Sequence, residues 1–219
     1  MSIALDHVFI CCSVGAPEAA ALLRLGLKES SPNTHPGQGT ACRRFSFANA
    51  YLELFWVSDA EEARSDLVRP TRLWERWSGR RTTACPFGVV LRPDPPGDQD
   101  PPFETWAYHP RYLPPELAIE LAVGTPIGEP ELFYLRFARG PDFVRREPID
   151  HAIPLNAISS VTLGTPLPGP RSAAAQSVEL AGVLSFRPAD EHVLTLAFDG
   201  EASKEVADLR PELPLVLRW

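Results

Sequence analysis

Two short segments recur along the chain and constrain its fold more than any single element does. Residues 5–10 and 158–163 each open a unit, and residues 51–54 and 193–196 each close one, 46 and 35 residues later. Such self-similarity indicates a repeat architecture, and repeated strands that pair edge to edge cover exposed sheet edges. We therefore predict an α+β protein in which repeated βαβββ modules form a curved, cup-like mixed or antiparallel sheet, with helices outside and a pocket inside.

The first 58 residues show the module most clearly. Residues 3–12 are apolar and β-branched enough to be a strand, and a helix is expected to begin near Pro17 and to end at Gly26. After a polar loop, residues 40–47 and 51–57 read as two strands joined by a tight connection. The expected order is therefore strand, helix, loop, strand, strand.

We divide the rest of the chain by composition into a diverged middle segment over 59–154, with proline-rich loops, and a final diverged module over 155–219. Together with residues 1–58 they are expected to make one compact domain. In the middle segment, Leu73, Trp74 and Trp77 recur at helical spacing. Strands are expected at 86–91, 105–108, 117–123, 132–137, 158–163, 183–186, 193–198 and 213–217, and a short helix at 172–177.

Charge and composition narrow the classes of protein. The net charge is -7 and the basic residues are dispersed among acidic ones, which argues against binding to a nucleic acid backbone. No apolar run is long enough for a membrane helix, and the N-terminus lacks the basic region of a signal peptide. The cysteines contain no CxxC pair and are expected as buried thiols in a reducing cytoplasm; they are Cys11, Cys12, Cys42 and Cys85.

One ionisable residue on each of two strands is placed among apolar neighbours. Period-two alternation puts Leu5, His7 and Phe9 on one face of the first strand. On the closing strand, the same alternation puts Glu53 between Tyr51 and Phe55. A buried carboxylate without a partner would cost several kcal/mol. We therefore expect His7 and Glu53 to point into the pocket, floored by the aromatic residues, and to pair with each other or to bind a metal.

These residues lie in motifs that resemble a known family. The family's opening motifs look like four segments of this chain, namely Leu5-Asp6-His7, the segment from Ala19 to Leu27, the loop from His35 to Thr40 and the strand Tyr51-Leu52-Glu53-Leu54. The family is that of the glyoxalase-like domain proteins of the vicinal oxygen chelate superfamily. The resemblance is good over residues 1–58. Residues 87–92 are similar to a later strand of such proteins, whereas the remainder resembles them more loosely.

The resemblance implies a divalent metal ion that His and Glu side chains hold at the inner face of paired modules. The substrate would coordinate the metal through two neighbouring oxygens, and the reaction would be of the lyase, isomerase or dioxygenase type. Only His7 and Glu53 fall on the family's ligand positions. The final module has Ser160 and Thr195 where a second pair of ligands would be expected.

Other side chains are candidates for the missing ligands. Glu120 is the preferred third ligand or catalytic base, because Ile119-Glu120-Leu121 copies Leu52-Glu53-Leu54. Glu131, His109 and His151 are further candidates, although a surface position or a simple salt bridge would also explain each histidine. His35, in a loop that contains glycine and proline, is placed in the substrate pocket or on a lid over it.

Two other classes remain open beside a metal-dependent enzyme. The same cup would suit a metal-free binding protein of the antibiotic-resistance type, and a scaffold without pocket chemistry is a third reading. In the first two cases the partner is a small molecule, and the chain is expected as a monomer or a homodimer. The motifs of nucleotide-binding P-loops and of serine hydrolases are absent from the sequence.

Overall fold

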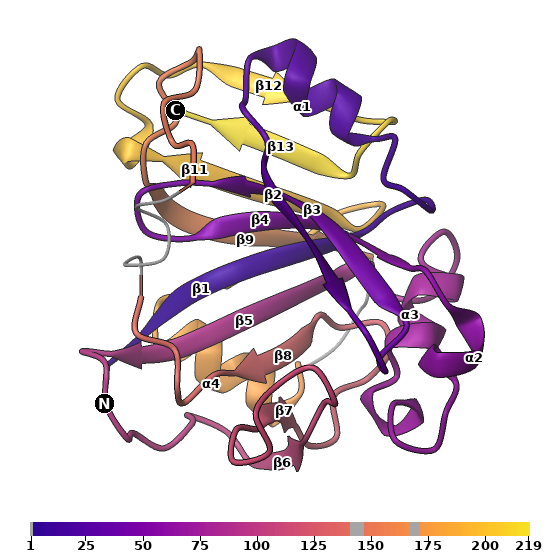
Figure 1. The fold of residues 1–219 in the computed structure, drawn as a ribbon. Helices are drawn as coiled ribbons and strands as arrows, with labels where there is room; N and C mark the ends of the chain where they lie inside the picture. The colour runs from indigo at the N-terminus through magenta and orange to yellow at the C-terminus, as the bar shows by residue number, and fades with distance from the viewer. Residues whose placement is uncertain (1, 141–146, 167–170) are drawn as a thin grey trace.

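The computed structural model describes residues 2–140, 147–166 and 171–219, which form two mixed β-sheets and a few short helices (Figure 1). The large sheet has the strand order β2-β3-β4-β1-β5-β8-β7-β6, and the small sheet has the order β10-β9-β11-β13-β12. This α+β architecture confirms the predicted fold class. None of the described helices is long and apolar enough to cross a membrane.

The strands of the large sheet are β1 (Ser2–Cys11), β2 (Ser30–His35), β3 (Thr40–Ser46), β4 (Tyr51–Val57), β5 (Phe87–Asp94), β6 (Thr105–Tyr108), β7 (Ile119–Ala122) and β8 (Glu131–Tyr134). Those of the small sheet are β9 (Ile158–Thr165), β10 (Ser185–Pro188), β11 (Val193–Phe198), β12 (Val206–Asp208) and β13 (Leu215–Arg218). The helical elements are α1 (Ala19–Leu25), α2 (Ala60–Ala63), η1 (Arg69–Thr71), α3 (Leu73–Gly79), α4 (Ala173–Leu180) and η3 (Asp199–Glu201).

The large sheet consists of two halves with matching strand order. In the first half β1 runs parallel to β4, and in the second half β5 runs parallel to β8. The two halves meet where β1 pairs antiparallel with β5. The structural counterpart of the first module is therefore residues 87–134, which lack a described helix between β5 and β6.

This arrangement differs from the internal repeat that the sequence predicted. The expected counterpart of β4 in the final module is β11, but β11 runs antiparallel to β9, whereas β4 runs parallel to β1. Residues 155–219 instead build the small sheet, which lies along one side of the large sheet with α1 beside it (Figure 1). Their resemblance to the first module reflects alternating apolar strands rather than the same topology.

A β-bulge in β1 decides which side chains face the core. The pairing of β1 with β5 shifts between Leu5 and His7, so Asp6 is the extra residue. Leu5 consequently joins Val8 and Ile10 in the core shared with the small sheet, while Phe9 lies in a second cluster on the other face. The prediction that Leu5 shares a face with His7 and Phe9 is wrong, because strict alternation does not survive a bulge.

One fully buried arginine joins several elements near the starts of β5 and β8. Arg76 of α3 donates hydrogen bonds from Nη1 to the carbonyl oxygens of Cys85 and Glu129, at 2.7 Å each. Its Nη2 lies 2.9 Å from a carboxylate oxygen of Glu131 on β8. The carboxylate of Glu129 in turn accepts a hydrogen bond from the backbone N–H of Ser172, just before α4. Arg76 thus ties α3 to the ends of β5 and β8.

The partly buried His192 makes stability depend on pH. Burial, followed by the charges of Arg76 and Arg171, lowers the pKa of His192 to about 4. A histidine in the unfolded chain has a pKa of about 6.5. Below that pH the unfolded chain therefore binds a proton that the folded chain does not. Stability is therefore lost as the pH falls from about 6.5 toward 4. We expect the thermal unfolding midpoint to drop over this range, and to drop less in His192→Gln; an equal drop in both proteins would contradict this assignment.

Candidate functional site

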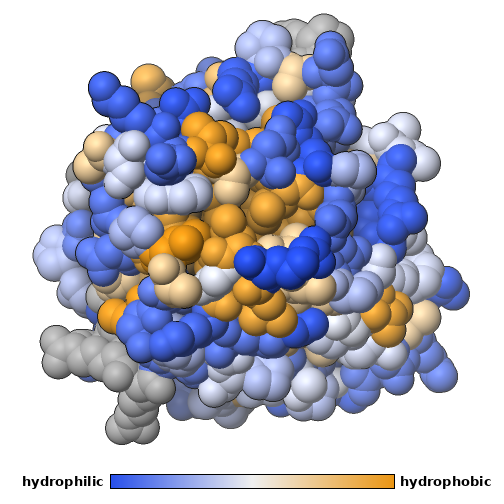
Figure 2. Space-filling model, turned by 90° about the horizontal axis from the view of Figure 1, so that it is seen from above, coloured by the Kyte–Doolittle hydropathy of each residue, from blue (hydrophilic) through white to orange (hydrophobic). Residues whose placement is uncertain are grey.

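The inner face of the large sheet forms a cup with a cavity of about 200 Å³. Its first half is lined by side chains from β1, β2 and β4, and its second half by side chains from β5 to β8 and the segments that follow β6 and β8. Leu73 at the start of α3 closes one wall. On the face drawn in Figure 2, apolar side chains likewise gather in a hollow with a hydrophilic rim. A cavity of about 150 Å³ is enough for benzene, so the cup has room for a single-ring compound.

His7 and Glu53 meet in this cup, as the alternation of the two strands predicted. The His7 Nε2 atom lies 3.9 Å from a carboxylate oxygen of Glu53. The imidazole stacks on the ring of Tyr51 with a centroid distance of 4.3 Å. Phe9 and Phe55 stack 5.0 Å apart and form part of the same wall. The expected pocket residues of the first module are therefore brought together.

Asp6 orients the His7 ring, a role that the sequence analysis missed. Because of the bulge, a carboxylate oxygen of Asp6 lies 2.7 Å from His7 Nδ1, although neighbouring residues in a regular strand point to opposite faces. A carboxylate at Nδ1 fixes the proton of the neutral imidazole on that nitrogen, so Nε2 keeps a lone pair. His7 Nε2 and the Glu53 carboxylate consequently present two hydrogen-bond acceptors, or two metal donors, to the same point of the cup.

A neutral thiol contacts the Glu53 carboxylate. The Cys42 Sγ atom donates to Glu53 Oε1 at 3.3 Å. Burial, and then the Glu53 carboxylate, raise the pKa of the Cys42 thiol, so it stays protonated and keeps this donor role. The same two causes raise the pKa of Tyr51 well above its usual range. Glu53 itself is only 5% exposed, so the carboxylate faces the cup rather than bulk solvent.

His35 lies in the wall of the cup and not on a lid. It is the last residue of β2, its Nδ1 lies 2.9 Å from Thr40 Oγ1, and its Nε2 lies 3.1 Å from Asn33 Nδ2. Burial is the main cause that lowers the pKa of His35, and a neutral ring suits partners that are themselves neutral. Both ring nitrogens are therefore used in holding the wall.

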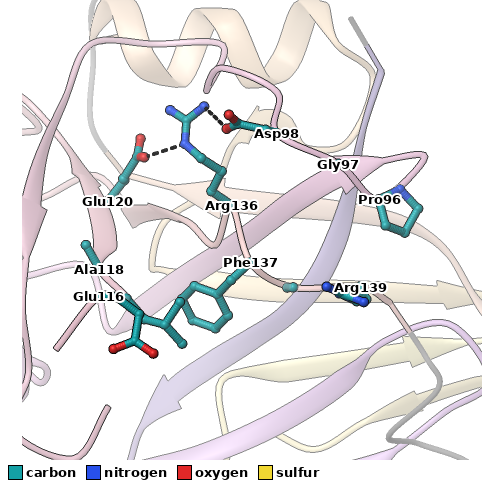
Figure 3. A pocket seen from close by; sticks show the side chains of 11 residues that line it. Pro96, Gly97, Asp98, Glu116, Ala118, Glu120, Arg136, Phe137 and Arg139 are labelled. Carbon is teal, nitrogen blue, oxygen red and sulfur yellow. Dashed lines mark hydrogen bonds and ion pairs between the residues drawn. The ribbon is translucent and has the colours of Figure 1, made fainter. Parts of the chain in front are cut away.

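Glu120 is not brought together with His7 and Glu53. It lies on β7, where its carboxylate accepts hydrogen bonds from Arg136 Nε and from Thr105 Oγ1, each at 3.0 Å. Glu120 and Arg136 border a separate surface hollow of about 610 Å³, in which the Arg136 guanidinium lies between Glu120 and Asp98 (Figure 3). This hollow is larger than the cup, but acidic groups around it already neutralise Arg136.

The remaining ligand candidates also lie elsewhere. Glu131 is paired with Arg76, His109 is exposed, and His151 lies 3.0 Å from the carbonyl oxygen of Ser46. Ser160 and Thr195 belong to the small sheet. None of these side chains lines the cup.

The second half of the cup offers no further metal donors at the matching strands. There, β5 presents Val90, and β8 and its end present Phe133 and Leu135. Within residues 2–140, 147–166 and 171–219, no three His, Cys, Asp or Glu side chains group as a metal site. A catalytic zinc site normally has three protein ligands. The residues present thus fit half of the metal site that the resemblance implies, and not a complete one.

Several polar side chains of the cup were not found from the sequence. Asn33, Gln38 and Thr71 line the first half, and Tyr108 and Tyr112 line the second. The Tyr112 hydroxyl donates to Gln38 Oε1 at 3.3 Å and its ring packs 4.9 Å from that of His35. Tyr112 lies between strands, where period-two alternation says nothing about direction, so no sequence pattern marks it.

Comparison with known protein families identifies a family for part of the chain. A family model described as a glyoxalase-like domain matches residues 5–111. No curated protein matches this chain. Among solved structures, a hypothetical protein from Staphylococcus aureus aligns with 11% identity and a TM-score of 0.49, covering 100% of this chain and 98% of that one. Residues 5–111, from the middle of β1 to just past β6, thus belong to a glyoxalase-like domain family of the vicinal oxygen chelate superfamily.

Proposed function

We propose that this chain binds a small, single-ring aromatic molecule in the cup, and that two adjacent hydroxyl groups of that molecule donate to His7 and Glu53. The observation that carries the proposal is the convergence of two acceptors, His7 Nε2 and the Glu53 carboxylate, 3.9 Å apart in a cavity that several phenylalanine side chains also line. Their separation exceeds a direct hydrogen bond, so each acceptor keeps capacity for a ligand. A pair of neighbouring donors satisfies both acceptors, whereas a single hydroxyl satisfies one.

The apolar part of the cup supports an aromatic ligand. Phe9, Phe55 and Phe133 surround the cavity, with the ring of Phe9 5.0 Å from Phe55 and 5.8 Å from Phe133. Aromatic side chains at such distances favour stacked or tilted contacts with a further ring. Burial of a flat apolar ring would contribute most of the affinity, and the acceptor pair would set its orientation.

The test uses catechol and its monomethyl ether guaiacol, which differ by one donor. Titration calorimetry in buffer with EDTA should show catechol binding about tenfold or more tightly than guaiacol, because a hydrogen bond to a charged group is worth about 1.5–3 kcal/mol. Glu53→Gln and His7→Phe should remove this preference. Glu120→Gln changes a carboxylate outside the cup and should leave it intact. Equal binding of the two compounds by the unaltered protein would refute the proposal.

A metal-dependent enzyme is the second candidate, favoured by the contact between Asp6 and His7. Metal-bound histidines almost always have a carboxylate or carbonyl at the other ring nitrogen, and Asp6 provides one at 2.7 Å. His7 and Glu53 would hold a divalent ion, which would supply Lewis-acid chemistry to a bound oxygen. Asp6 would keep Nε2 directed at the ion, and the apolar second half would exclude water.

Elemental analysis separates the two candidates. Protein purified without chelator that contains one divalent ion per chain, lost in His7→Ala, would support the metal-dependent enzyme. Catechol binding would then disappear in EDTA, because the ion would hold the ligand. Metal-free protein that binds catechol equally with and without EDTA would support the binding protein. Asp6→Asn should weaken binding in both cases, since it releases the imidazole from its fixed orientation.

A further inference from the structure

The hydroxyl of Tyr108 is a buried polar group without a partner among the described residues. Tyr108, at the end of β6, is 2% exposed and lines the cup. Within the part of the chain that the structure describes, its hydroxyl oxygen is buried and has no hydrogen-bond partner. Buried hydroxyls in folded proteins nearly always have a partner, and an orphaned one destabilises the fold. Because the Tyr108 residue lines the cup, a ligand bound there is a group that can supply the missing partner.

The position of this hydroxyl is unusual within the second half of the cup. The other side chains that β5, β7 and β8 present there are apolar, namely Val90, Ile119 and Phe133. Tyr108 packs in the same apolar cluster as Phe9, Val90 and Phe133. Its hydroxyl is therefore a polar group among the apolar side chains that the strands present there, and it can orient a ligand with which those side chains make only apolar contacts.

The charges around the cup limit the ligand further. Among the described residues that line the cup there is the Glu53 carboxylate but no lysine or arginine. An anionic ligand would therefore meet a buried carboxylate and none of these cationic side chains in the described lining. Burial raises the pKa of Tyr108 to about 12, so its hydroxyl is protonated near neutral pH and donates. A neutral oxygen with free lone pairs is the group that suits this donor.

We propose that Tyr108 is a specificity-determining residue that donates a hydrogen bond to a neutral carbonyl oxygen on the ligand, so that the cup selects acyl-substituted aromatic diols over alkyl-substituted ones. The inference rests on the proposed function, since it concerns the same cup and the same ligand. It adds a second polar contact, made by the opposite half of the sheet from His7 and Glu53. Substrate or ligand selection then depends on both halves.

The experiment compares 3,4-dihydroxyacetophenone with 4-ethylcatechol, which are alike in size and differ in the carbonyl oxygen. Binding of both is measured to the unaltered chain and to Tyr108→Phe. The preference for the acetyl compound should be about tenfold larger in the unaltered chain than in the variant, because one hydrogen bond is lost. Comparing ratios cancels the effect of the acetyl group on the acidity of the ligand's hydroxyls.

Tyr112→Phe is the matched control, because it removes a cup hydroxyl that already has Gln38 as its partner. It should leave the acetyl-to-ethyl preference unchanged. Tyr108→Phe should keep or raise the unfolding midpoint, since it removes an unpartnered hydroxyl. If unsubstituted catechol fails to bind, both the proposed function and this inference are refuted. If catechol binds but the preference is the same with and without the Tyr108 hydroxyl, the inference alone is overturned.

Discussion

Replacement of Arg76 by methionine should lower the free energy of unfolding by about 3–5 kcal/mol, as expected when one partner of a buried ion pair is removed. Arg76 is 0% exposed and the Glu131 side chain beside it 6% exposed. The variant leaves the Glu131 carboxylate buried without its counterion, and it leaves the carbonyl oxygens of Cys85 and Glu129 without their donor. Because domains are stable by only about 5–15 kcal/mol, urea denaturation should show a clearly lower midpoint.

Two further variants isolate the cause of this loss. Arg24→Met removes an exposed ion pair with Glu212 and should change stability by less than about 1 kcal/mol. The double variant Arg76→Met with Glu131→Leu should recover part of the loss, because no uncompensated charge remains buried. A midpoint for Arg76→Met equal to that of Arg24→Met would show that the buried pair contributes nothing to stability.

The sequence was sufficient for the first half of the cup because that half follows regular patterns. Strand alternation placed His7 and Glu53 on one face, and the structure brings them within 3.9 Å. The same rule failed at Leu5. Alternation predicts the face on which a side chain lies only while each residue of a strand pairs with one residue of the neighbouring strand. The bulge at Asp6 breaks this condition, and it also creates the contact between Asp6 and His7 that orients the imidazole.

The second half of the cup could not be predicted, because its similarity to the first half is visible only in the pairing of the strands. The segment between β5 and β6 has no described helix, and β6, β7 and β8 have four residues each, too few for alternation to identify a face. Glu53 and Glu120 are both flanked by apolar residues, so the sequence suggested equivalent positions. In the structure, however, Glu120 lies on β7, which corresponds to β3 of the first half and not to β4. Tyr108 and Tyr112 reach the cup through tertiary packing alone.

The close approach of β1 and β5 links packing in the sheet to the volume of the cup. Gly88 on β5 pairs directly with Phe9 on β1. A Cβ atom at Gly88 would lie 2.0 Å from Cε1 of the Phe9 ring and 2.2 Å from its Cζ, far inside van der Waals contact. The ring can yield little, because Phe55 and Phe133 pack around it. Gly88 is thus needed for the position of the ring that floors the cup.

Gly88→Ala should therefore lower the free energy of unfolding by about 1–3 kcal/mol, as overpacking of a core does, and should abolish measurable catechol binding because the displaced ring takes up space in the cup. Gly97→Ala is the control, since a Cβ atom there meets nothing within 4 Å, and its effect should stay within about 0.5 kcal/mol. The double variant Gly88→Ala with Phe9→Leu should regain stability and part of the binding, because a smaller side chain relieves the clash. Normal catechol affinity in Gly88→Ala would mean that the ligand does not occupy the space beside Phe9, and the cup would then be ruled out as its binding site.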